Sequence, residues 1–503
     1  MLAVATSNEV DPQNTAANDK LTPESKIAIS VLFASTFTVI LNEMLMGVAL
    51  PTVMADLGIT ASTAQWLTTA YMLTMAVVIP ATGFLTERFR MQTVYTLAMS
   101  LFTVGILVAI AAPGFEVLLI GRIIQAIGTA IATPLAFTAV TALVPPSRAG
   151  RMMALLTVSV STAPAFGPAM AGAILSVAGW RWLFVFILPI AVISLVVGNM
   201  MIRVPSTPRK TRVDGLSVLL SAIGFASLVY GLASFGESSG GHAIISPWAA
   251  LVVGIVVVAM FVARQLFLQK SDRALLDMRP FAVRSFAVPA LLAVFFMTAA
   301  TGMMTLIPVI LQASYGLTPL QTGLFMLPGG LTITVISVVV GRVYDRLGAR
   351  PLMIVGAIFD GAGLWFLSTL APGTPIWLLL ATYMFIIVGQ AFLWTPTYAA
   401  SLGALNKHLL PHGSAIMNTI QQLSGAAGIA IAFSIMTATS AALRSGGQAI
   451  QPAMAQGAQQ SHLVAFGMLV LGLGVALMMP KTNATPNGSA TAPPTRTRIT
   501  SRA

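Results

Sequence analysis

Three ionisable residues stand inside long apolar stretches of the chain. Glu43 lies past the middle of the first stretch, Arg122 near the start of the fourth, and Asp360 near the centre of the eleventh. A charge at the centre of a bilayer costs about 2.5 to 3.5 kcal/mol on insertion scales, so retained charges usually belong to ion or substrate pathways. A carboxyl group in such a place can bind and release a proton. We therefore take Glu43 and Asp360 as candidate proton-binding residues, and Glu43 can also neutralise a cationic ligand.

Each of the three residues also has a structural interpretation, which the sequence leaves open. Glu43 can be a hydrogen-bonding group between helices. Asp360 shares its helix face with Gly356 and Gly363, where a neighbouring helix can approach closely and supply a polar contact. Arg122 can extend its long side chain to the nearer membrane interface.

Two later stretches carry polar and aromatic faces. In the stretch at 376–403, Trp394 and Tyr398 share a face with Gln390 and Ser401, and the stretch at 411–440 carries several amides. Aromatic rings with a few amides suit an amphipathic, cationic ligand through stacking and cation–π contacts. Trp66 and Trp394 can equally be packing or interfacial anchors. The candidate substrate-binding residues are Asn42, Trp66, Tyr71, Gln125, Trp394, Tyr398, Asn418 and Gln421.

The composition places most of the chain in lipid. Of the 503 residues, 57% are hydrophobic and 8% charged, whereas soluble domains usually carry about 25% charged residues. The absence of cysteine excludes thiolate metal sites and thiol nucleophiles. No Walker loop precedes a lysine, so we expect no cofactor and an ion gradient as the energy source. The net charge of +12 comes from clusters between apolar runs, which argues against nucleic acid as a partner.

Spans of about 20 apolar residues predict fourteen transmembrane helices. They lie at 27–52, 64–84, 92–112, 117–143, 152–178, 182–202, 215–236, 247–268, 286–312, 319–341, 351–370, 376–403, 411–440 and 463–480. The four histidines then fall in loops or at helix ends, which leaves the carboxylates as the better proton carriers. The predicted fold is an all-α polytopic membrane protein.

The basic residues give an independent test of this topology. If both tails are cytoplasmic, only Arg181 and Arg444 of the 26 Lys and Arg residues fall on the outer side. Arg122 is counted as embedded, and Arg264, near the cytoplasmic end of its span, is counted as inside. This asymmetry is the positive-inside pattern of inner-membrane proteins. We therefore predict a multi-pass protein of the bacterial inner membrane with the lipid bilayer around it.

An internal repeat divides the chain. After the second span the sequence reads Gly83, three residues, Glu87 and Arg88, and after the tenth span it reads Gly341, three residues, Asp345 and Arg346. Such repetition predicts two homologous halves around a central site. The predicted segments are a tail at 1–26, a six-helix half at 27–202, a two-helix insert at 203–285, a second six-helix half at 286–480 and a disordered tail at 481–503.

Four motifs together resemble those of the major facilitator superfamily, and most closely its fourteen-span drug:proton antiporter family, over roughly residues 27 to 480. The repeated loops resemble the family's gate motif, although Glu87 replaces its Asp, and Leu119 to Gly128 resembles its helix-4 Arg motif. The segment from Ala163 to Gly172 is similar to its helix-5 antiporter motif, and Leu41 to Pro51 agrees with its first helix.

The resemblance implies the major facilitator fold, with two six-helix halves and two extra central helices. It also implies that Arg122 takes part in proton coupling beside Glu43 and Asp360. The residues implied in gating and in packing between the halves are Gly83, Glu87, Arg88, Gly167, Pro168, Gly172, Gly341, Asp345 and Arg346. In the helix-5 motif, ordinary close packing remains the structural alternative.

Together these features predict a proton-coupled exporter of amphipathic, cationic drugs or toxic compounds, with a small molecule as its partner and a periplasmic adaptor as a further one. The alternative is an exporter dedicated to one metabolite, amino acid or antibiotic, because one scaffold serves many solutes. A membrane enzyme needs a nucleophile and base, or a metal cluster, at one depth, and the sequence offers none. A transporter-like sensor usually carries an extra soluble domain, which neither tail can form.

Overall fold

The computed structural model of the chain consists of helices throughout the part that it describes. The described residues are 23–144, 152, 163, 166–202, 214–238, 245–271, 274–370, 374–406 and 409–479. The α-helices are α2 (Pro23–Leu57), α3 (Ala61–Ala64), α4 (Trp66–Arg88), α5 (Met91–Ile110), α6 (Phe115–Leu143), α8 (Arg181–Met201), α9 (Gly215–Ser238), α10 (Pro247–Leu268), α11 (Arg284–Ala313), α12 (Pro319–Leu347), α13 (Ala349–Thr369), α14 (Ile376–Gly403), α15 (Leu410–Ser445) and α16 (Ile450–Leu477), with 3-10 helices at Gln269–Ser271 and Arg279–Ala282.

Thirteen helices of the described part are long and apolar enough to cross a membrane. A shorter apolar helix, Phe166–Val177, lies inside the predicted span at 152–178, most of whose first half falls outside the described residues. These helices account for the fourteen predicted spans, and the predicted all-α membrane fold is confirmed. The arrangement satisfies the backbone hydrogen bonds within each helix, as lipid requires.

The last helix differs from its prediction, because it begins at Ile450 and not after His462. Residues 450–462 contain glutamines and small residues, which lower the hydropathy of the segment. Packing compensates for this: a Cβ atom on Gly457 would clash with the carbonyl oxygen of Met436 in α15. Small residues let the two backbones approach closely, which stabilises the helix. His462 therefore lies near the middle of α16, with only 3% of its surface exposed.

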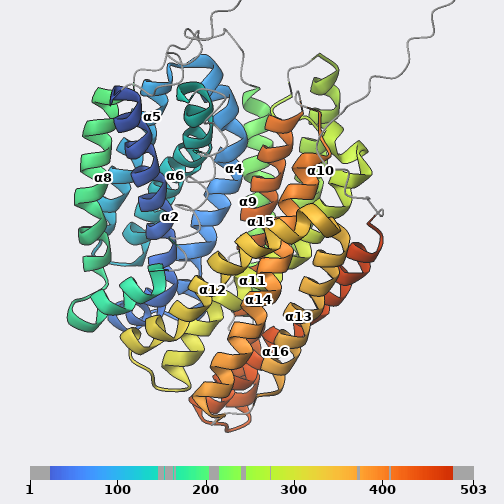
Figure 1. Ribbon diagram of the computed structural model, residues 1–503. Helices are drawn as coiled ribbons and strands as arrows, with labels where there is room; N and C mark the ends of the chain where they lie inside the picture. The colour runs from blue at the N-terminus through green and yellow to red at the C-terminus, as the bar shows by residue number, and fades with distance from the viewer. Residues whose placement is uncertain are drawn as a thin grey trace, which may run out of the picture.

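The helices form two groups with a helical hairpin beside their seam (Figure 1). Helices α2 to α8 make one group and α11 to α16 the other, as the colours from blue to green and from yellow to red show. Helix α9 packs against α4 and α15, whereas α10 packs mainly against α9. Ser434 in α15 donates to the carbonyl oxygens of Leu232 (3.0 Å) and Ala233 (2.9 Å) in α9. The hairpin α9–α10 falls within the predicted two-helix insert at 203–285, and the division of the chain into two halves and an insert stays a prediction.

Polar contacts define the two ends of the bundle. At one end, Arg284 donates to the carbonyl oxygen of Met478 (3.2 Å) and Arg350 to that of Leu477 (3.0 Å), so α11 and α13 begin where α16 ends. We call this the near side, and α2 also begins there. At the other end, the far side, Arg181 at the start of α8 donates to Asp56 (3.2 Å) at the end of α2. Basic side chains beside the last carbonyls of a helix also suit its dipole.

The two groups contact each other on the far side. A Cβ atom on Gly172 would clash with the backbone at Pro319, and one on Gly323 would clash with the backbone at Pro168. The Gln312 side chain of α11 donates to the Val48 carbonyl of α2 (3.1 Å). Glycines in both groups thus bring the Phe166–Val177 helix and α12 into backbone contact, as in other close helix crossings in membranes.

Candidate functional site

Arg122 is the centre of a buried polar cluster in the first group of helices. None of its surface is exposed, although Arg122 lies only two turns after the start of α6. Its Nη1 atom donates to Gln125 Oε1 (2.9 Å), and its Nε atom donates to the carbonyl oxygen of Leu67 in α4 (3.3 Å). The guanidinium carbon lies 4.1 Å from the centre of the Tyr71 ring, a cation–π contact. Arg122 therefore points into the bundle and does not extend to the membrane interface.

Helix α2 joins the cluster through Asn42 and Glu43. Asn42 Nδ2 donates to Gln125 Oε1 at 3.0 Å, so that one oxygen accepts hydrogen bonds from two helices. Glu43 is half-buried beside them, and the charge of Arg122 acts on its carboxylate. Within the described residues no oxygen of Glu43 comes within 4.0 Å of a basic nitrogen. The acid and the base therefore interact without forming a fixed ion pair, which leaves the Glu43 carboxylate free to take a proton.

Several polar atoms of this cluster have no hydrogen-bond partner among the described residues. They are Asn42 Oδ1, Arg122 Nη2, Gln125 Nε2 and both side-chain polar atoms of Gln65. A buried polar group left unpaired costs about 1 to 3 kcal/mol, so retained groups of this kind usually serve a ligand or water. The cluster therefore has spare donors and acceptors, one of them on Asn42, the residue before Glu43.

Two members of the cluster were missed from the sequence. Thr129 shares a hydrogen bond of 2.7 Å with the Tyr71 hydroxyl, and Gln65 is fully buried just before α4. Thr129 stands four residues after Gln125, a spacing that places both on one helix face. Gly128 faces α5 and not the cluster. A Cβ atom added to Gly128 would lie 2.5 Å from the Ala98 carbonyl oxygen of α5.

Asp360 lies in the second group of helices, apart from Glu43 and Arg122. It is fully buried, and neither carboxylate oxygen has a hydrogen-bond partner among the described residues. Its helix α13 packs against α14 and α16, and a Cβ atom on Gly389 of α14 would clash with the Asp360 backbone. The expected close helix approach is present, but the expected interhelical polar contact to the carboxylate is not seen in the described part. The proton-coupling role of Asp360 stays a prediction.

An aromatic face lies where α14 meets α15. Trp394 and Tyr398 are stacked with their ring centres 5.7 Å apart, and the Tyr398 hydroxyl donates to Gln421 Oε1 (2.7 Å). Trp394 keeps 37% of its surface exposed, whereas Asn418 is half-buried and donates to a carbonyl of its own helix. The structure thus brings together three of the four predicted substrate-binding residues of this half through direct contacts.

Trp66 is the predicted substrate-binding residue that the structure places elsewhere. Its ring centre lies 6.1 Å from that of Tyr230 in α9, so it packs against the insert. This position fits the packing interpretation of Trp66. Its substrate-binding role stays a prediction.

The predicted gate motifs lie on the near side and are only partly described. The side chains of Glu87 and Asp345 and the surroundings of Gly83 lie outside the described residues. The Arg88 guanidinium lies 6.0 Å from the centre of the Phe89 ring, Arg346 is exposed, and Gly341 faces open space. The charge contacts implied for the gate stay a prediction.

The helix-5 motif, by contrast, lies at a contact between the two groups. A Cβ atom on Gly167 would lie 2.7 Å from the Met44 side chain of α2, one residue after Glu43. Pro168 and Gly172 contact α12 through backbone atoms, as described above. The motif therefore connects the helix that carries Glu43 with the opposite half.

An ion pair joins the two helices of the insert on the near side. Arg264 in α10 donates to both carboxylate oxygens of Asp214 at 2.5 and 2.6 Å. These hydrogen bonds hold the pKa of the Asp214 carboxyl below its ordinary value. Gln265 extends the network, because its side chain bonds Ser217 (2.7 Å) and the backbone of Leu276 (3.1 Å).

Two groups of apolar helices around buried polar residues define a multi-pass membrane transporter. The chain belongs to the Major Facilitator Superfamily, whose family model matches residues 32–429. It is therefore a transporter and not an enzyme.

Proteins similar to this chain include two from Bacillus subtilis. The chain is 36% identical over 469 residues to the Uncharacterized MFS-type transporter YcnB, covering 93% of this chain and 98% of that protein. It is 33% identical over 461 residues to the Lincomycin resistance protein LmrB, covering 90% and 95%. Among solved structures, a bacterial homolog of the human lysosomal transporter Spinster, in an inward-facing and occupied conformation, has a TM-score of 0.66 at 14% identity and covers 92% of this chain and 97% of that one. The last likeness establishes the fold.

Proposed function

We propose that the protein is a proton-coupled exporter of amphipathic, cationic drugs or toxic compounds that works by alternating access. The observation that carries this proposal is the buried cluster of Asn42, Glu43, Arg122 and Gln125. Among the residues that the structure describes, it holds an acid without a fixed ion pair beside polar atoms without partners. A membrane-embedded acid that can exchange a proton near a cation is suited to antiport. The printed name of LmrB, a lincomycin resistance protein, supports a drug as the substrate class.

In the proposed cycle, the proton and the cationic substrate compete for Glu43. Substrate that enters from the near side displaces the proton, and Arg122 stabilises the carboxylate when neither is bound. Because each ligand weakens the binding of the other, the inward proton gradient drives the substrate outward. Asp360 is the second proposed proton site. The aromatic face at Trp394 and Tyr398 supplies the stacking surface for the substrate.

The proposed orientation places the near side in the cytoplasm of a bacterial cell, with the protein in the inner membrane. Arg88, Arg284, Arg346 and Arg350 all lie at near-side ends of helices, as the positive-inside rule requires of cytoplasmic loops. The contacts between Gly172, Gly323 and their partners then close the outer side. We propose that the proton gradient is the energy source, that no cofactor is needed, and that a periplasmic adaptor is a further partner.

The test is transport of a fluorescent cationic dye into everted vesicles that carry an imposed pH gradient. Wild-type protein is expected to accumulate dye only with the gradient, and Glu43→Gln to bind dye without accumulating it. Glu116→Gln is the matched control, since Glu116 is exposed in the first turn of α6. Gradient-independent transport by the wild-type protein would contradict proton coupling, and normal accumulation by Glu43→Gln would remove Glu43 from the mechanism.

A further inference from the structure

His462 is a buried imidazole that the proposed exchange at Glu43 does not use. It lies near the middle of α16 with 3% of its surface exposed, and its Nε2 atom has no hydrogen-bond partner among the described residues. An imidazole can bind a proton at one ring nitrogen and release one from the other, which suits it to proton transfer. Its surroundings decide whether protons can reach it.

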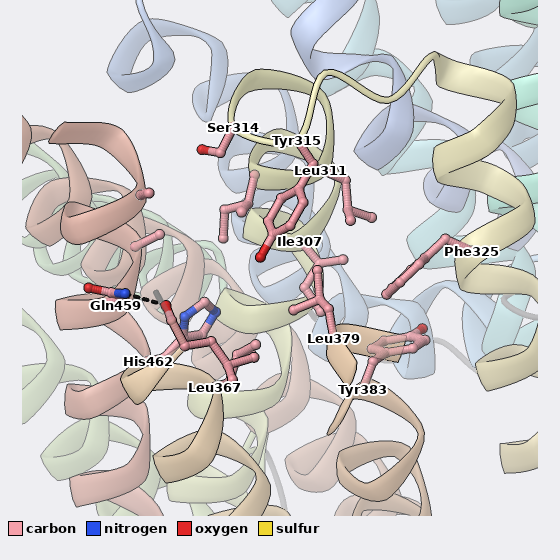
Figure 2. A pocket seen from close by; sticks show the side chains of 14 residues that line it. Ile307, Leu311, Ser314, Tyr315, Phe325, Leu367, Leu379, Tyr383, Gln459 and His462 are labelled. Atoms are coloured by element: carbon pink, nitrogen blue, oxygen red, sulfur yellow. Dashed lines mark hydrogen bonds between the residues drawn. The ribbon is translucent and has the colours of Figure 1, made fainter. Parts of the chain in front are cut away.

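A cavity opens beside His462 in the far-side part of the second half (Figure 2). Helices α11, α12, α13, α14 and α16 all contribute to its walls, and its far-side end is formed by Ser314, Tyr315 and Leu370 at the ends of α11 and α13. The cavity volume is about 50 Å³, which is room for several water molecules. In Figure 2 the Tyr315 hydroxyl points into this space, with His462 on the opposite wall.

The cavity walls offer the polar partners that water needs. Besides His462, they include the hydroxyls of Ser314, Tyr315 and Tyr383 and the amide of Gln459. Ser314 Oγ has no hydrogen-bond partner among the described residues. Gln459 donates to the Leu370 carbonyl at the end of α13, which fixes α16 against the far-side end of the cavity. A cavity of this size with several polar groups is suited to hold water.

His462 also lines a second, smaller cavity that reaches deeper into the bundle. This cavity has a volume of about 10 Å³, near the lower limit for one water molecule. Thr298 and Gly302 of α11, Gly428 of α15 and Ser461 of α16 are among its walls. One imidazole thus separates a cavity at the far side from a cavity in the middle of the second half.

The helices that pack against α16 place few other ionisable groups near His462. Helix α11 carries only Arg284, at its near-side end, and α15 carries His412 near its start and Arg444 at its far-side end. Arg444 is exposed and stands six residues before α16 begins. None of these three residues lines either cavity.

The remaining ionisable groups come from α13, α14 and the loop after α11. Tyr315 and Tyr383 share the larger cavity with His462. On α13, Arg350 lies at the near side, whereas Asp360 lies two turns before Leu367, which lines the larger cavity. Asp360 is thus the acid of α13, the helix that packs against α16, nearest along the chain to the larger cavity. Its carboxylate has no hydrogen-bond partner among the described residues.

We propose that His462 is a proton-binding site that takes protons from water in the far-side cavity and passes them towards the middle of the second half. The imidazole gains one proton and one positive charge from hydronium on the far side. It then gives up one proton on the side of the smaller cavity, and no bond between heavy atoms forms or breaks. This inference rests on the proposed proton-coupled export and adds to it the entry route for the proton.

The test uses full-length protein in proteoliposomes and the same cationic dye, with external pH varied from about 5 to 8, around the ordinary pKa of imidazole. His462→Gln keeps a polar side chain and removes the titrating group. We expect gradient-driven transport to fall by about tenfold or more, the scale of losing a proton-transfer group, and its pH dependence to flatten. Dye exchange without a gradient stays at the wild-type level. His412→Gln is the matched control and keeps the wild-type pH profile.

A second variant keeps the inference testable if His462→Gln does not fold. Ala455→Leu fills the larger cavity while leaving the imidazole in place. Gly467→Leu introduces the same side chain at an exposed position of α16, where a Cβ atom meets no described atom within 4 Å. We expect Ala455→Leu to slow gradient-driven transport and Gly467→Leu to leave it unchanged. Wild-type pH profiles in both His462→Gln and Ala455→Leu overturn this inference and leave the proposed function standing. Accumulation of dye by the wild-type protein without a gradient overturns both.

Discussion

Gln125 offers a sharp test of how the polar cluster works, because its Oε1 atom accepts hydrogen bonds from both Arg122 (2.9 Å) and Asn42 (3.0 Å). Gln125→Leu removes both bonds at similar side-chain volume. A hydrogen bond to a charged group contributes about 1.5 to 3 kcal/mol and a neutral one about 0.5 to 1.5 kcal/mol. The expected loss is therefore about 2 to 4.5 kcal/mol, which should lower the Tm of a chain of this length by about 2 to 4 °C.

Gln125→Glu separates stability from transport. It keeps an acceptor for both donors, so we expect a Tm within about 1 °C of the wild-type value. The new carboxylate pairs permanently with Arg122, which then no longer stabilises the deprotonated Glu43. Gradient-driven dye transport should fall by about tenfold or more, since the coupling free energy between the two sites is lost.

The measurements are thermal unfolding of purified protein in detergent and dye accumulation in proteoliposomes. Gln92→Leu is the control, because the Gln92 amide bonds the Asn199 carbonyl at an exposed site near the start of α5. If Gln125→Leu is as stable as Gln92→Leu, the two hydrogen bonds of Gln125 contribute nothing measurable to stability. If Gln125→Glu accumulates dye at the wild-type rate, Arg122 is not needed to stabilise the deprotonated Glu43.

Three further predictions concern packing, substrate contact and pH. Gly128→Val places a side chain against the backbone of α5 and should lower the free energy of unfolding by about 1 to 3 kcal/mol, as other overpacked sites do, in thermal denaturation. Trp394→Ala removes the ring stacked on Tyr398 and should weaken binding of an aromatic cationic dye about three- to tenfold in fluorescence titration, whereas a non-aromatic cation is affected less. The ion pair of Asp214 with Arg264 stabilises the insert above the unfolded pKa of about 3.9, and this stabilisation is lost as the pH falls through the lower folded pKa. Asp214→Asn should therefore be less stable than the wild-type protein at pH 7 and show a smaller difference at pH 3.

The controls for these predictions use sites without the same contacts. Gly341→Val adds the same bulk where a Cβ atom meets no atom of the described residues within 4 Å, so equal destabilisation by Gly128→Val and Gly341→Val would contradict the packing argument. Trp248 lies exposed in α10, and Trp248→Ala should leave dye binding unchanged. If Asp214→Asn follows the wild-type stability curve from pH 3 to 7, the ion pair contributes nothing measurable.

Hydropathy and charge placement predicted most of the fold, because lipid leaves few alternatives to apolar helices of about 20 residues. The start of α16 could not be predicted in this way. Its first turns contain glutamines and small residues whose burial depends on contacts with α15, and those contacts involve residues distant in sequence. For the same reason the sequence placed His462 at a helix end, whereas it lies near the middle of α16.

The candidate site was likewise only partly predictable from the sequence. The ionisable residues Glu43, Arg122 and Asp360 were visible in the sequence because charge is costly in lipid. Their partners were only partly visible: Thr129 follows from helical spacing, but the Leu67 carbonyl that receives Arg122 depends on how α4 crosses α6. Trp66 looked like a cavity residue, since nothing in the sequence indicates that α9 covers it.

The most direct test of the central claim is proton release when substrate binds to the purified protein. A cationic dye is added to weakly buffered protein in detergent near pH 7, and a pH indicator reports the protons released. We expect release by the wild-type protein and loss of this release in Glu43→Gln, with dye binding retained in both. If the wild-type protein binds dye without releasing protons, the proton and the substrate do not compete, and the proposed antiport is contradicted.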